Sequence, residues 1–452
     1  MTSLAPGVRV HVVGVGGAGM SGLARLLVEM GCGVSGSDAV ESPVLVSLRD
    51  AGVVVTVGHD ASNGSDAQII VFSPAIPESN VELVAARNRG ASLLTRAQVL
   101  ATLAQRQPVI GLTGTHGKTT ATSMLAHVLH AAGRDDSRLL GAAVTGLGEN
   151  GHLGTGSLVL EVDESFGTFS LLVPFALGLL NVESDHLDHY GTVEALEAEF
   201  AHLLARTTGP VVVWGDDPGA ARVASRSGRD VQLVGTRDAA WTVENVTLDK
   251  RSASFRLTGP IGALEICLGV TGAHNVANAA VVAALASALG VAPDAIATGL
   301  RAFCGAPRRF EYLGQWRGVD VYEDYAHLPG EIAATLAAAR SIGYERVTAV
   351  FQPHRVTRTL SLAEPLAAAL EGADNIVVAD IYASGEANPT GATGELVARH
   401  IHARPGATSA YGATFDDVLK LLESRHDQSD VVLLLGAGDI AQVAQRLSGG
   451  LS

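Results

Sequence analysis

The chain contains the segment Gly114-Thr115-His116-Gly117-Lys118-Thr119-Thr120, which is typical of a loop that binds nucleotide phosphates. A strand-like apolar segment at 108–112 precedes it, and a helical segment at 121–132 follows it. In this setting the N–H groups of the turn and of the helix N-terminus can surround a polyphosphate. Lys118 would add a positive charge at the phosphates, and the Thr119 hydroxyl could bind the accompanying Mg²⁺. The segment predicts an ATP or GTP site, although Leu112 stands where the strict motif has glycine; a turn without a ligand is the alternative.

The composition is that of a folded protein with more than one domain. A chain of 452 residues is too long for one ordinary core, and 47% hydrophobic against 17% charged residues excludes long disorder. The net charge of −15 argues against non-specific binding to nucleic acid or to anionic membranes, because both need a basic surface. The three widely spaced cysteines predict neither disulfides nor zinc, and each is expected to be a small buried hydrophobic residue. No signal peptide or membrane span is evident, so a cytoplasmic location is expected.

Alternating strand and helix patterns predict an α/β protein with three domains. The first hundred residues have a doubly wound parallel pattern, and linkers at 105–108 and 305–307 set the borders. We therefore predict a Rossmann-like N-terminal domain at 1–107, a P-loop-type central ATP-binding domain at 108–306 and a Rossmann-like C-terminal domain at 307–452.

A second glycine loop follows the first predicted strand. Gly14, Gly16 and Gly19 match G-x-G-x-x-G, and Asp38 ends the next strand, where a ribose-binding acid would lie. The motif is compatible with NAD, but any nucleotide diphosphate could approach the backbone there. A tight strand–helix turn without a ligand is also possible.

Acidic segments follow two predicted strands of the central domain. The segment 161–165 follows one strand, and another strand is followed by an acidic segment that contains His186. Because ligands bind at the carboxyl ends of strands in α/β sheets, these side chains are candidate Mg²⁺ ligands beside the phosphate loop. Solvated acidic turns are the alternative.

Further polar residues point to nucleotide and anion binding. His274 and Asn278 lie one turn apart at the start of a predicted helix, where they could meet an adenine edge or cap the helix. Basic residues of the third domain could bind phosphate or carboxylate, although a solvated helix face would also explain the last two of them. These residues are Arg308, Arg309, His327, His354, Arg355 and Arg358. Two phosphate loops in separate domains predict that ATP meets a second, nucleotide-linked substrate.

Together these segments resemble the Mur ligase family over the whole length of the chain. The resemblance rests on residues 14–22, 114–120, 161–165 and 324–327. The first of these, Gly-Val-Gly-Gly-Ala-Gly-Met-Ser-Gly, is similar to the alanine-adding branch of the family, and the absence of glycine at 112 is also normal for this family.

The resemblance implies an ATP-dependent amide ligase with Mg²⁺. It would join L-alanine to the lactyl carboxylate of UDP-N-acetylmuramate through an acyl phosphate, in peptidoglycan precursor synthesis. The N-terminal domain would hold the UDP sugar, the central domain ATP, and the C-terminal domain would close over the site. A monomer or a homodimer is expected.

The resemblance also implies roles for individual residues. The UDP-sugar site would contain Gly16, Gly17, Ala18, Gly19, Met20, Ser21, Asp38, Ser73 and Tyr325. The ATP site would contain Gly114, Thr115, His116, Gly117, Lys118, Thr119, Thr120, His274, Asn278, Arg309 and Asp324. The metal ligands would be Thr119, Glu161 and His186, and the catalytic residues Lys118, His327, Arg355 and Arg358.

The chain departs from the usual family pattern in three segments. It has His327-Leu328-Pro329-Gly330-Glu331 where a second histidine and a threonine are usual, Glu323 before Asp324, and Val162 and Phe166 in the acidic segment. These departures bear on the choice of amino acid more than on the chemistry. A Mur-like ligase for another amino acid or a muropeptide, a non-catalytic nucleotide-binding regulator and a hydride-transfer enzyme are the alternatives.

Overall fold

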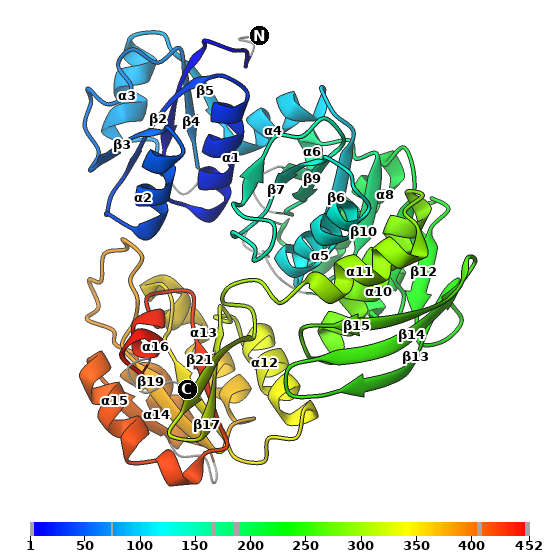
Figure 1. The fold of residues 1–452 in the computed structure, drawn as a ribbon. Helices are drawn as coiled ribbons and strands as arrows, with labels where there is room; N and C mark the ends of the chain where they lie inside the picture. The colour runs from blue at the N-terminus through cyan, green and yellow to red at the C-terminus, as the bar shows by residue number, and fades with distance from the viewer. Residues whose placement is uncertain (1–3, 74–75, 165–167, 184–189, 405–408, 448–452) are drawn as a thin grey trace. The chain divides into compact units, whose positions relative to one another are not determined.

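The computed structural model describes residues 4–73, 76–164, 168–183, 190–404 and 409–447. Within these ranges the chain forms three β-sheets flanked by helices (Figure 1), which confirms the predicted three-domain α/β fold. Two compact units contain them: one holds the first two sheets, and the other is built mainly from 307–452 with the short segments 248–253 and 270–273. The predicted borders near 107 and 306 stay predictions.

The first sheet has the strand order β3-β2-β1-β4-β5, and its strands are parallel. Its strands are β1 Arg9–Val13, β2 Gly33–Asp38, β3 Val54–Val57, β4 Ile69–Phe72 and β5 Ser92–Thr95. Its helices are α1 Ala18–Glu29, α2 Pro43–Asp50, α3 Val81–Asn88 and α4 Arg96–Ala104. The order reverses between β1 and β4, so the loop after β1 and Ser73 after β4 lie at the point where such sheets bind ligands.

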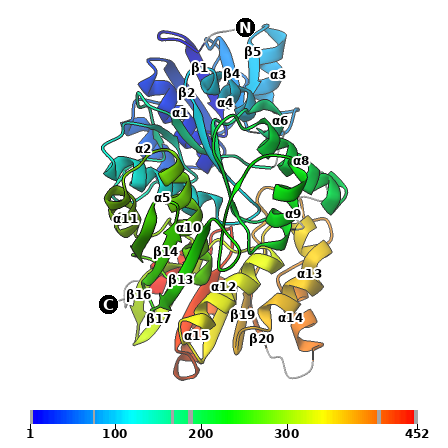
Figure 2. The same ribbon diagram turned by 90° about the vertical axis from the view of Figure 1, so that its right-hand side faces the viewer.

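The second sheet has the order β15-β14-β13-β12-β11-β10-β6-β9-β7-β8 in the described residues. Its strands are β6 Val109–Thr113, β7 Ser137–Leu139, β8 Gly151–His152, β9 Leu158–Glu161, β10 Ala176–Leu179, β11 Val211–Trp214, β12 Gln232–Gly235, β13 Trp241–Leu248, β14 Ala253–Gly259 and β15 Gly262–Leu268. Its helices are α5 Lys118–Ala131, α6 Thr168–Leu171, α8 Val193–Arg206, α9 Pro218–Arg226, α10 Ala273–Ala288 and α11 Pro293–Ala302. Figure 2 shows the longer strands β13 and β14 side by side. Every residue of β6 and β10 is buried, as expected for central parallel strands covered on both faces.

The third sheet has the order β16-β17-β21-β18-β19-β20, with β16 antiparallel and the other pairings parallel. Its strands are β16 Glu311–Trp316, β17 Val319–Asp324, β18 Val347–Phe351, β19 Asn375–Ala379, β20 Ser409–Gly412 and β21 Val431–Leu435. Its helices are α12 Pro329–Ser341, α13 Val356–Leu370, α14 Glu395–His402, α15 Phe415–Glu423, the 3₁₀ helix His426–Gln428 and α16 Ala441–Leu447.

Two of the three cysteines contradict the expectation from sequence. Cys32 is buried, but Cys267 and Cys304 are exposed. Cys267 lies on β15, where residues alternate between the core and solvent, and it occupies an outward position. None of the helices in the described residues is long and apolar enough to cross a bilayer.

A buried polar cluster fixes the interior of the first sheet. The Glu82 carboxylate, 1% exposed, accepts hydrogen bonds from His11 Nε2 (3.1 Å), Ser37 Oγ (2.7 Å), His59 Nδ1 (3.0 Å) and Asn63 Nδ2 (2.9 Å). Burial alone would raise the pKa of Glu82, but these donors outweigh it and lower the pKa to about 2. The cluster therefore holds a charged carboxylate inside the domain.

Because its pKa is low, the charged Glu82 carboxylate should contribute to the free energy of unfolding, and this contribution should be lost at low pH. A carboxyl group with a lowered native pKa stabilises the fold above its unfolded pKa, and this contribution disappears as the pH falls towards about 2. We expect Glu82→Gln to lower the free energy of unfolding by about 3 kcal/mol near pH 7 and by much less near pH 3. Urea titrations followed by circular dichroism measure this difference.

Glu78→Gln is the matched control, because Glu78 lies just before α3 and its side chain is 91% exposed. We expect it to change the unfolding free energy little at either pH. An equal loss at both pH values for Glu82→Gln would contradict a charged native carboxylate.

Candidate active site

The phosphate loop joins β6 to α5 through two glycines with positive φ. Gly114 has φ +140° and Gly117 has φ +82°, a region that favours glycine. A Cβ at Gly114 would lie 3.0 Å from the backbone N of Asn181, and one at Gly117 would lie 2.9 Å from Asn278 Oδ1. Both the backbone conformation and the close neighbours therefore require glycine in this loop.

Lys118 is the first residue of α5, and its ammonium group turns back over the loop. Its Nζ donates to Gly114 O (2.6 Å) and Thr115 O (3.2 Å) and forms an ion pair with Glu164 Oε2 at 2.8 Å. Burial disfavours the charged ammonium, but Glu164, Asp163 and Glu161 outweigh it and raise the pKa of Lys118 above its usual value. The loop thus presents a fixed positive charge at a helix N-terminus, which suits a phosphate group.

The segment after β10 holds the other side of the loop. Asn181 Oδ1 accepts from His116 N (2.8 Å), Asn181 Nδ2 donates to His116 O (3.1 Å), and Asn181 O accepts from Thr115 N (3.1 Å). Glu183 N donates to Thr115 Oγ1 at 2.9 Å. Sequence reasoning did not assign Asn181 to the site, although its position directly after a strand beside β6 is a usable signal.

Two of the predicted metal ligands lie together at the same edge of the sheet. A Cβ at Gly141 would lie 2.6 Å from Glu161 Oε1 and 2.8 Å from Thr119 Oγ1, and Gly141 N donates to Glu161 Oε1 at 2.8 Å. A carboxylate and a hydroxyl oxygen form a donor set that fits Mg²⁺. The third predicted ligand, His186, lies outside the described residues, and no cluster of three His, Cys, Asp or Glu side chains suited to a metal occurs within them.

His274 and Asn278 lie in the first turns of α10, as predicted, but they differ in burial. Asn278 is 5% exposed, and its side-chain amide lies against Gly117 of the phosphate loop. His274 is exposed to solvent. Asn278 therefore belongs to the wall of the loop, and the adenine contact assigned to His274 stays a prediction.

The N-terminal glycine loop is closed by Asp38. Asp38 Oδ2 accepts from Gly16 N at 2.8 Å, and a Cβ at Gly16 would lie 2.9 Å from the same oxygen. Met20 and Ser21 of α1 are buried, each 3% exposed. Ser21 is therefore enclosed by the protein, and its assignment to the UDP-sugar site stays a prediction, as do the other assignments of this loop.

Sequence reasoning missed Arg96 beside this loop. A Cβ at Gly19 would lie 2.7 Å from Arg96 Cζ, so the guanidinium group packs against the first turn of α1. Arg96 begins α4 directly after β5, and its position at a strand end is a signal that sequence could have supplied. The loop therefore combines a helix N-terminus with a positive charge.

In the second unit, Asp324 at the end of β17 organises the segment around 308–326. Its carboxylate accepts from Phe310 N (2.7 Å) and Ala326 N (2.8 Å). Burial raises the pKa of Asp324 to about 6, against the lowering effect of Arg309. The guanidinium groups of Arg308 and Arg309 each lie 5.1 Å from the Tyr325 ring centroid.

A row of imidazole and phenol rings continues from Tyr325. The ring centroid of His327 lies 5.4 Å from that of Tyr325 and 5.6 Å from that of His354, which stacks on Tyr382 at 5.7 Å. Arg358 Nη1 lies 3.3 Å from His354 Nδ1. The structure thus brings His327 and Arg358 together through His354, which sequence reasoning had grouped only with the basic residues.

Arg355 is the residue just before α13, and it has an exposed side chain and an uncommon backbone conformation. Its φ is +70°, its N donates to Tyr382 O at 2.8 Å, and its Nε lies 3.4 Å from Glu386 Oε1. Arg355 therefore belongs to the same group of side chains, anchored through Tyr382 and Glu386.

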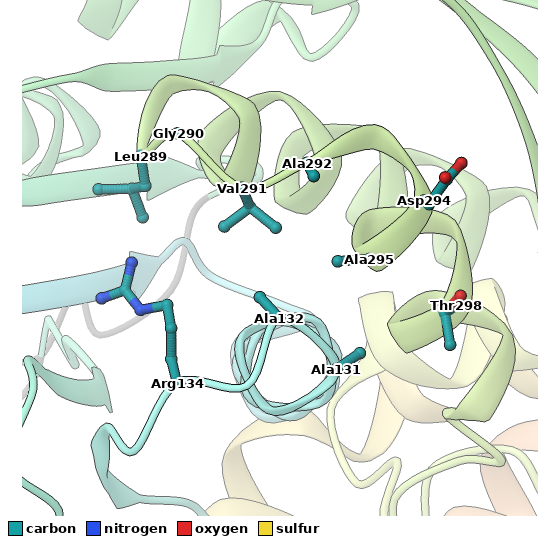
Figure 3. A pocket seen from close by; sticks show the side chains of 10 residues that line it. All are labelled: Ala131, Ala132, Arg134, Leu289, Gly290, Val291, Ala292, Asp294, Ala295 and Thr298. Carbon is teal, nitrogen blue, oxygen red and sulfur yellow. The ribbon is translucent and has the colours of Figure 1, made fainter.

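A cavity of about 630 Å³ lies at the opposite end of α5 from Lys118. Figure 3 shows Ala131 and Ala132 on one side of it and Val291, Ala292 and Ala295 on the other. The 13-residue separation along α5 places it about 20 Å from Lys118. Its mainly aliphatic lining lacks the polar groups of the phosphate loop, so it is not part of this site.

Three family models match successive parts of the chain. They are described as the Mur ligase family catalytic domain at residues 9–108, the Mur ligase middle domain at 112–286 and the Mur ligase glutamate ligase domain at 308–438. Together they cover most of the sequence and all three sheets.

Relatives match over nearly the whole chain. A UDP-N-acetylmuramate--L-alanine ligase from Thermobifida fusca is 41% identical over 455 residues, covering 97% of this chain and 96% of that protein. A ligase with the same name from Paenarthrobacter aurescens is 43% identical over 441 residues, covering 96% and 94%. The crystal structure of the UDP-N-acetylmuramate-alanine ligase from Thermotoga maritima is 29% identical, covers 98% of each chain and gives a TM-score of 0.83. The chain belongs to the Mur ligase family.

Proposed function

We propose that this protein is an ATP-dependent ligase that joins L-alanine to the lactyl carboxylate of UDP-N-acetylmuramate in peptidoglycan precursor synthesis. The observation that carries this proposal is the presence of two glycine loops at strand ends of one compact unit, the first at Gly14–Gly19 and the second holding Lys118. Full-length relatives with this activity in their names support the choice of substrates.

ATP occupies the loop at 114–120 in this proposal. Lys118 contacts the phosphates, Asn278 and His274 lie on the adenosine side, and Arg309 and Asp324 are further nucleotide contacts. Thr119 and Glu161, with His186, would hold Mg²⁺, which would supply positive charge against the polyphosphate. The UDP sugar lies at Gly16–Ser21 with Asp38, Ser73 and Tyr325, and Arg96 adds a positive charge against its diphosphate.

The reaction has two steps. An oxygen of the lactyl carboxylate attacks the γ-phosphorus of ATP; an O–P bond forms, the bond to the bridging oxygen breaks, and ADP leaves. The amine of L-alanine then attacks the acyl carbon, and the C–O bond to phosphate breaks. Lys118 offsets the negative charge in the first step, and Arg355 and Arg358 orient the carboxylates.

His327 is the proposed acceptor of the proton that the amine loses. Its Nδ1 lies 3.0 Å from Tyr325 O and 3.2 Å from Glu331 Oε2, so the hydrogen bonds assign the proton to Nδ1 and leave Nε2 as the acceptor. Burial lowers the pKa of His327, against the raising effect of Glu331. The imidazole is therefore neutral near pH 7, as a base must be.

We also propose that the protein acts in the cytoplasm, where ATP is available, and that it works as a monomer or a homodimer. Neither nucleic acid nor a membrane is needed for the reaction.

Release of inorganic phosphate tests the proposed reaction. With Mg²⁺, ATP and UDP-N-acetylmuramate, we expect rapid release only when L-alanine is added, and slower release with glycine or L-serine. Lys118→Ala should reduce kcat by at least about 10²-fold, because an uncompensated charge would develop in the transition state. Folding is checked by circular dichroism.

A panel of amino acids and a muropeptide serves as the control for substrate choice. Preference for another amino acid or for the peptide would replace L-alanine in the proposal. Absence of release with every acceptor would contradict the ligase activity itself.

The pH dependence of kcat tests the role of His327. We expect the rate to fall as the pH drops through the lowered pKa of His327, below its usual value near 6.5. Glu331→Gln removes a charge that favours the imidazolium form and should move this acid limb to lower pH. His327→Gln should abolish the limb and reduce kcat by about 10²–10⁴-fold. The measurement is the pH profile of phosphate release at saturating substrates.

Glu345→Gln is the control, because Glu345 is an exposed acid of the same unit. Its profile should match the wild type. An unchanged acid limb in His327→Gln would assign the base to another group.

A further inference from the structure

One face of α1 contacts the segment 149–153 and strand β7 of the central domain. Asn150 Nδ2 donates to Ala18 O (2.9 Å) and to Ser21 Oγ (3.1 Å) in the first turn of the helix. The same segment meets the helix again through the Arg25–Glu149 ion pair at 3.1 Å and the hydrogen bond from Leu153 N to Glu29 Oε2 at 2.5 Å. The spacing of these helix residues places them on one face. In Figure 1, α1 lies beside β7 of the same region.

Asn150 makes the contact nearest to the N-terminal glycine loop. It is 6% exposed, and both hydrogen bonds from its side-chain nitrogen end on residues assigned above to the UDP-sugar site. A buried amide that loses such partners leaves polar groups unsatisfied, which is costly. The orientation of the Ala18–Ser21 turn therefore depends on where Asn150 is held.

The main chain of Asn150 leads back to the metal-binding edge of the central sheet. Asn150 O accepts from Leu140 N at 2.8 Å. The next residue, Gly141, donates its N–H to Glu161 Oε1 at 2.8 Å and lies against Thr119. A short series of hydrogen bonds thus joins Glu161 to the first turn of α1.

We propose that Asn150 is a positioning residue that couples the two substrate sites. A nucleotide with Mg²⁺ that fixes Glu161 and Gly141 also fixes Leu140 and Asn150, and thereby the Ala18–Ser21 turn that receives the UDP sugar. This inference rests on the proposed function. Coupling of this kind means that the nucleotide and the UDP sugar each raise the affinity of the protein for the other by the same factor.

The coupling factor is measured by isothermal titration calorimetry. It is the Kd of UDP-N-acetylmuramate without nucleotide divided by its Kd at saturating Mg²⁺-ADP. We expect a factor of at least about 5 for the wild type. Asn150→Ala should reduce it to about 1, and so should Asn150→Asp, which keeps the shape of the side chain but cannot donate. Asn150→Asp also provides the test if the alanine variant does not fold.

Glu29→Gln is the matched control, because it weakens a contact between the same helix and the same segment. Glu29 lies 11 residues beyond Ala18, about 16 Å along the helix. A residue that merely holds the two domains together would act like Glu29. We therefore expect Glu29→Gln to retain the wild-type coupling factor.

Three results would contradict the inference: a wild-type factor near 1, an unchanged factor in both Asn150 variants, or an equal loss in Glu29→Gln. Binding of both ligands without coupling would overturn the inference alone. Binding of neither ligand by the wild type would overturn the proposed function and the inference with it.

Discussion

The arrangement of the phosphate loop and of the strands beside it depends on the buried positive charge of Lys118. An ammonium group 14% exposed must have compensating partners, and Glu164, two loop carbonyls and the neighbouring Asp163 and Glu161 provide them. These partners come from the ends of β6 and β9, so the strands must end at the same edge of the sheet. The positive φ of the loop glycines follows from the same requirement, because the chain must turn sharply enough for the first residue of α5 to reach back over it.

Sequence alone predicts much of this arrangement because the decisive features are local. The apolar run of β6, the glycine loop and α5 are contiguous, and the parallel strands β18, β19 and β21 appear as short apolar runs between helical patterns. Strands β16 and β20 lack such a run: Gly314 interrupts the first at a bulge, and the second is the short segment Ser409–Gly412. Their pairing depends on neighbouring strands rather than on their own residues.

The site residues that sequence reasoning missed are those whose partners are distant in the chain. Asn181 contacts a residue 65 positions away, and Asn150 one 132 positions away. The local pattern around Asn150 does not distinguish such a role from a turn, and that around Asn181 gives only its position after a strand. The wrong expectation for Cys267 has a related cause, since exposure depends on which face of β15 is covered. The roles of His186 and of the other assigned ligands stay predictions.

The structure also explains how an acidic protein can bind anionic substrates. A net charge of −15 excludes a broad basic surface, so positive charge is placed at single points: Lys118 at one loop, Arg96 at the other, and the arginines beside Tyr325 and His354 in the second unit. Lys118, Arg96 and Arg358 lie in the first turn of a helix, where backbone N–H groups add to the attraction. Selectivity then comes from geometry rather than from overall charge.

Transfer of oxygen from the sugar carboxylate to phosphate tests the central claim most directly. UDP-N-acetylmuramate labelled with ¹⁸O in its lactyl carboxylate is incubated with the protein, Mg²⁺, ATP and L-alanine, and the released phosphate is analysed by mass spectrometry. Attack of the carboxylate on the γ-phosphorus predicts that each phosphate carries one oxygen from the carboxylate. Product formation with unlabelled phosphate would show that the loop around Lys118 does not direct phosphoryl transfer to the sugar-linked carboxylate.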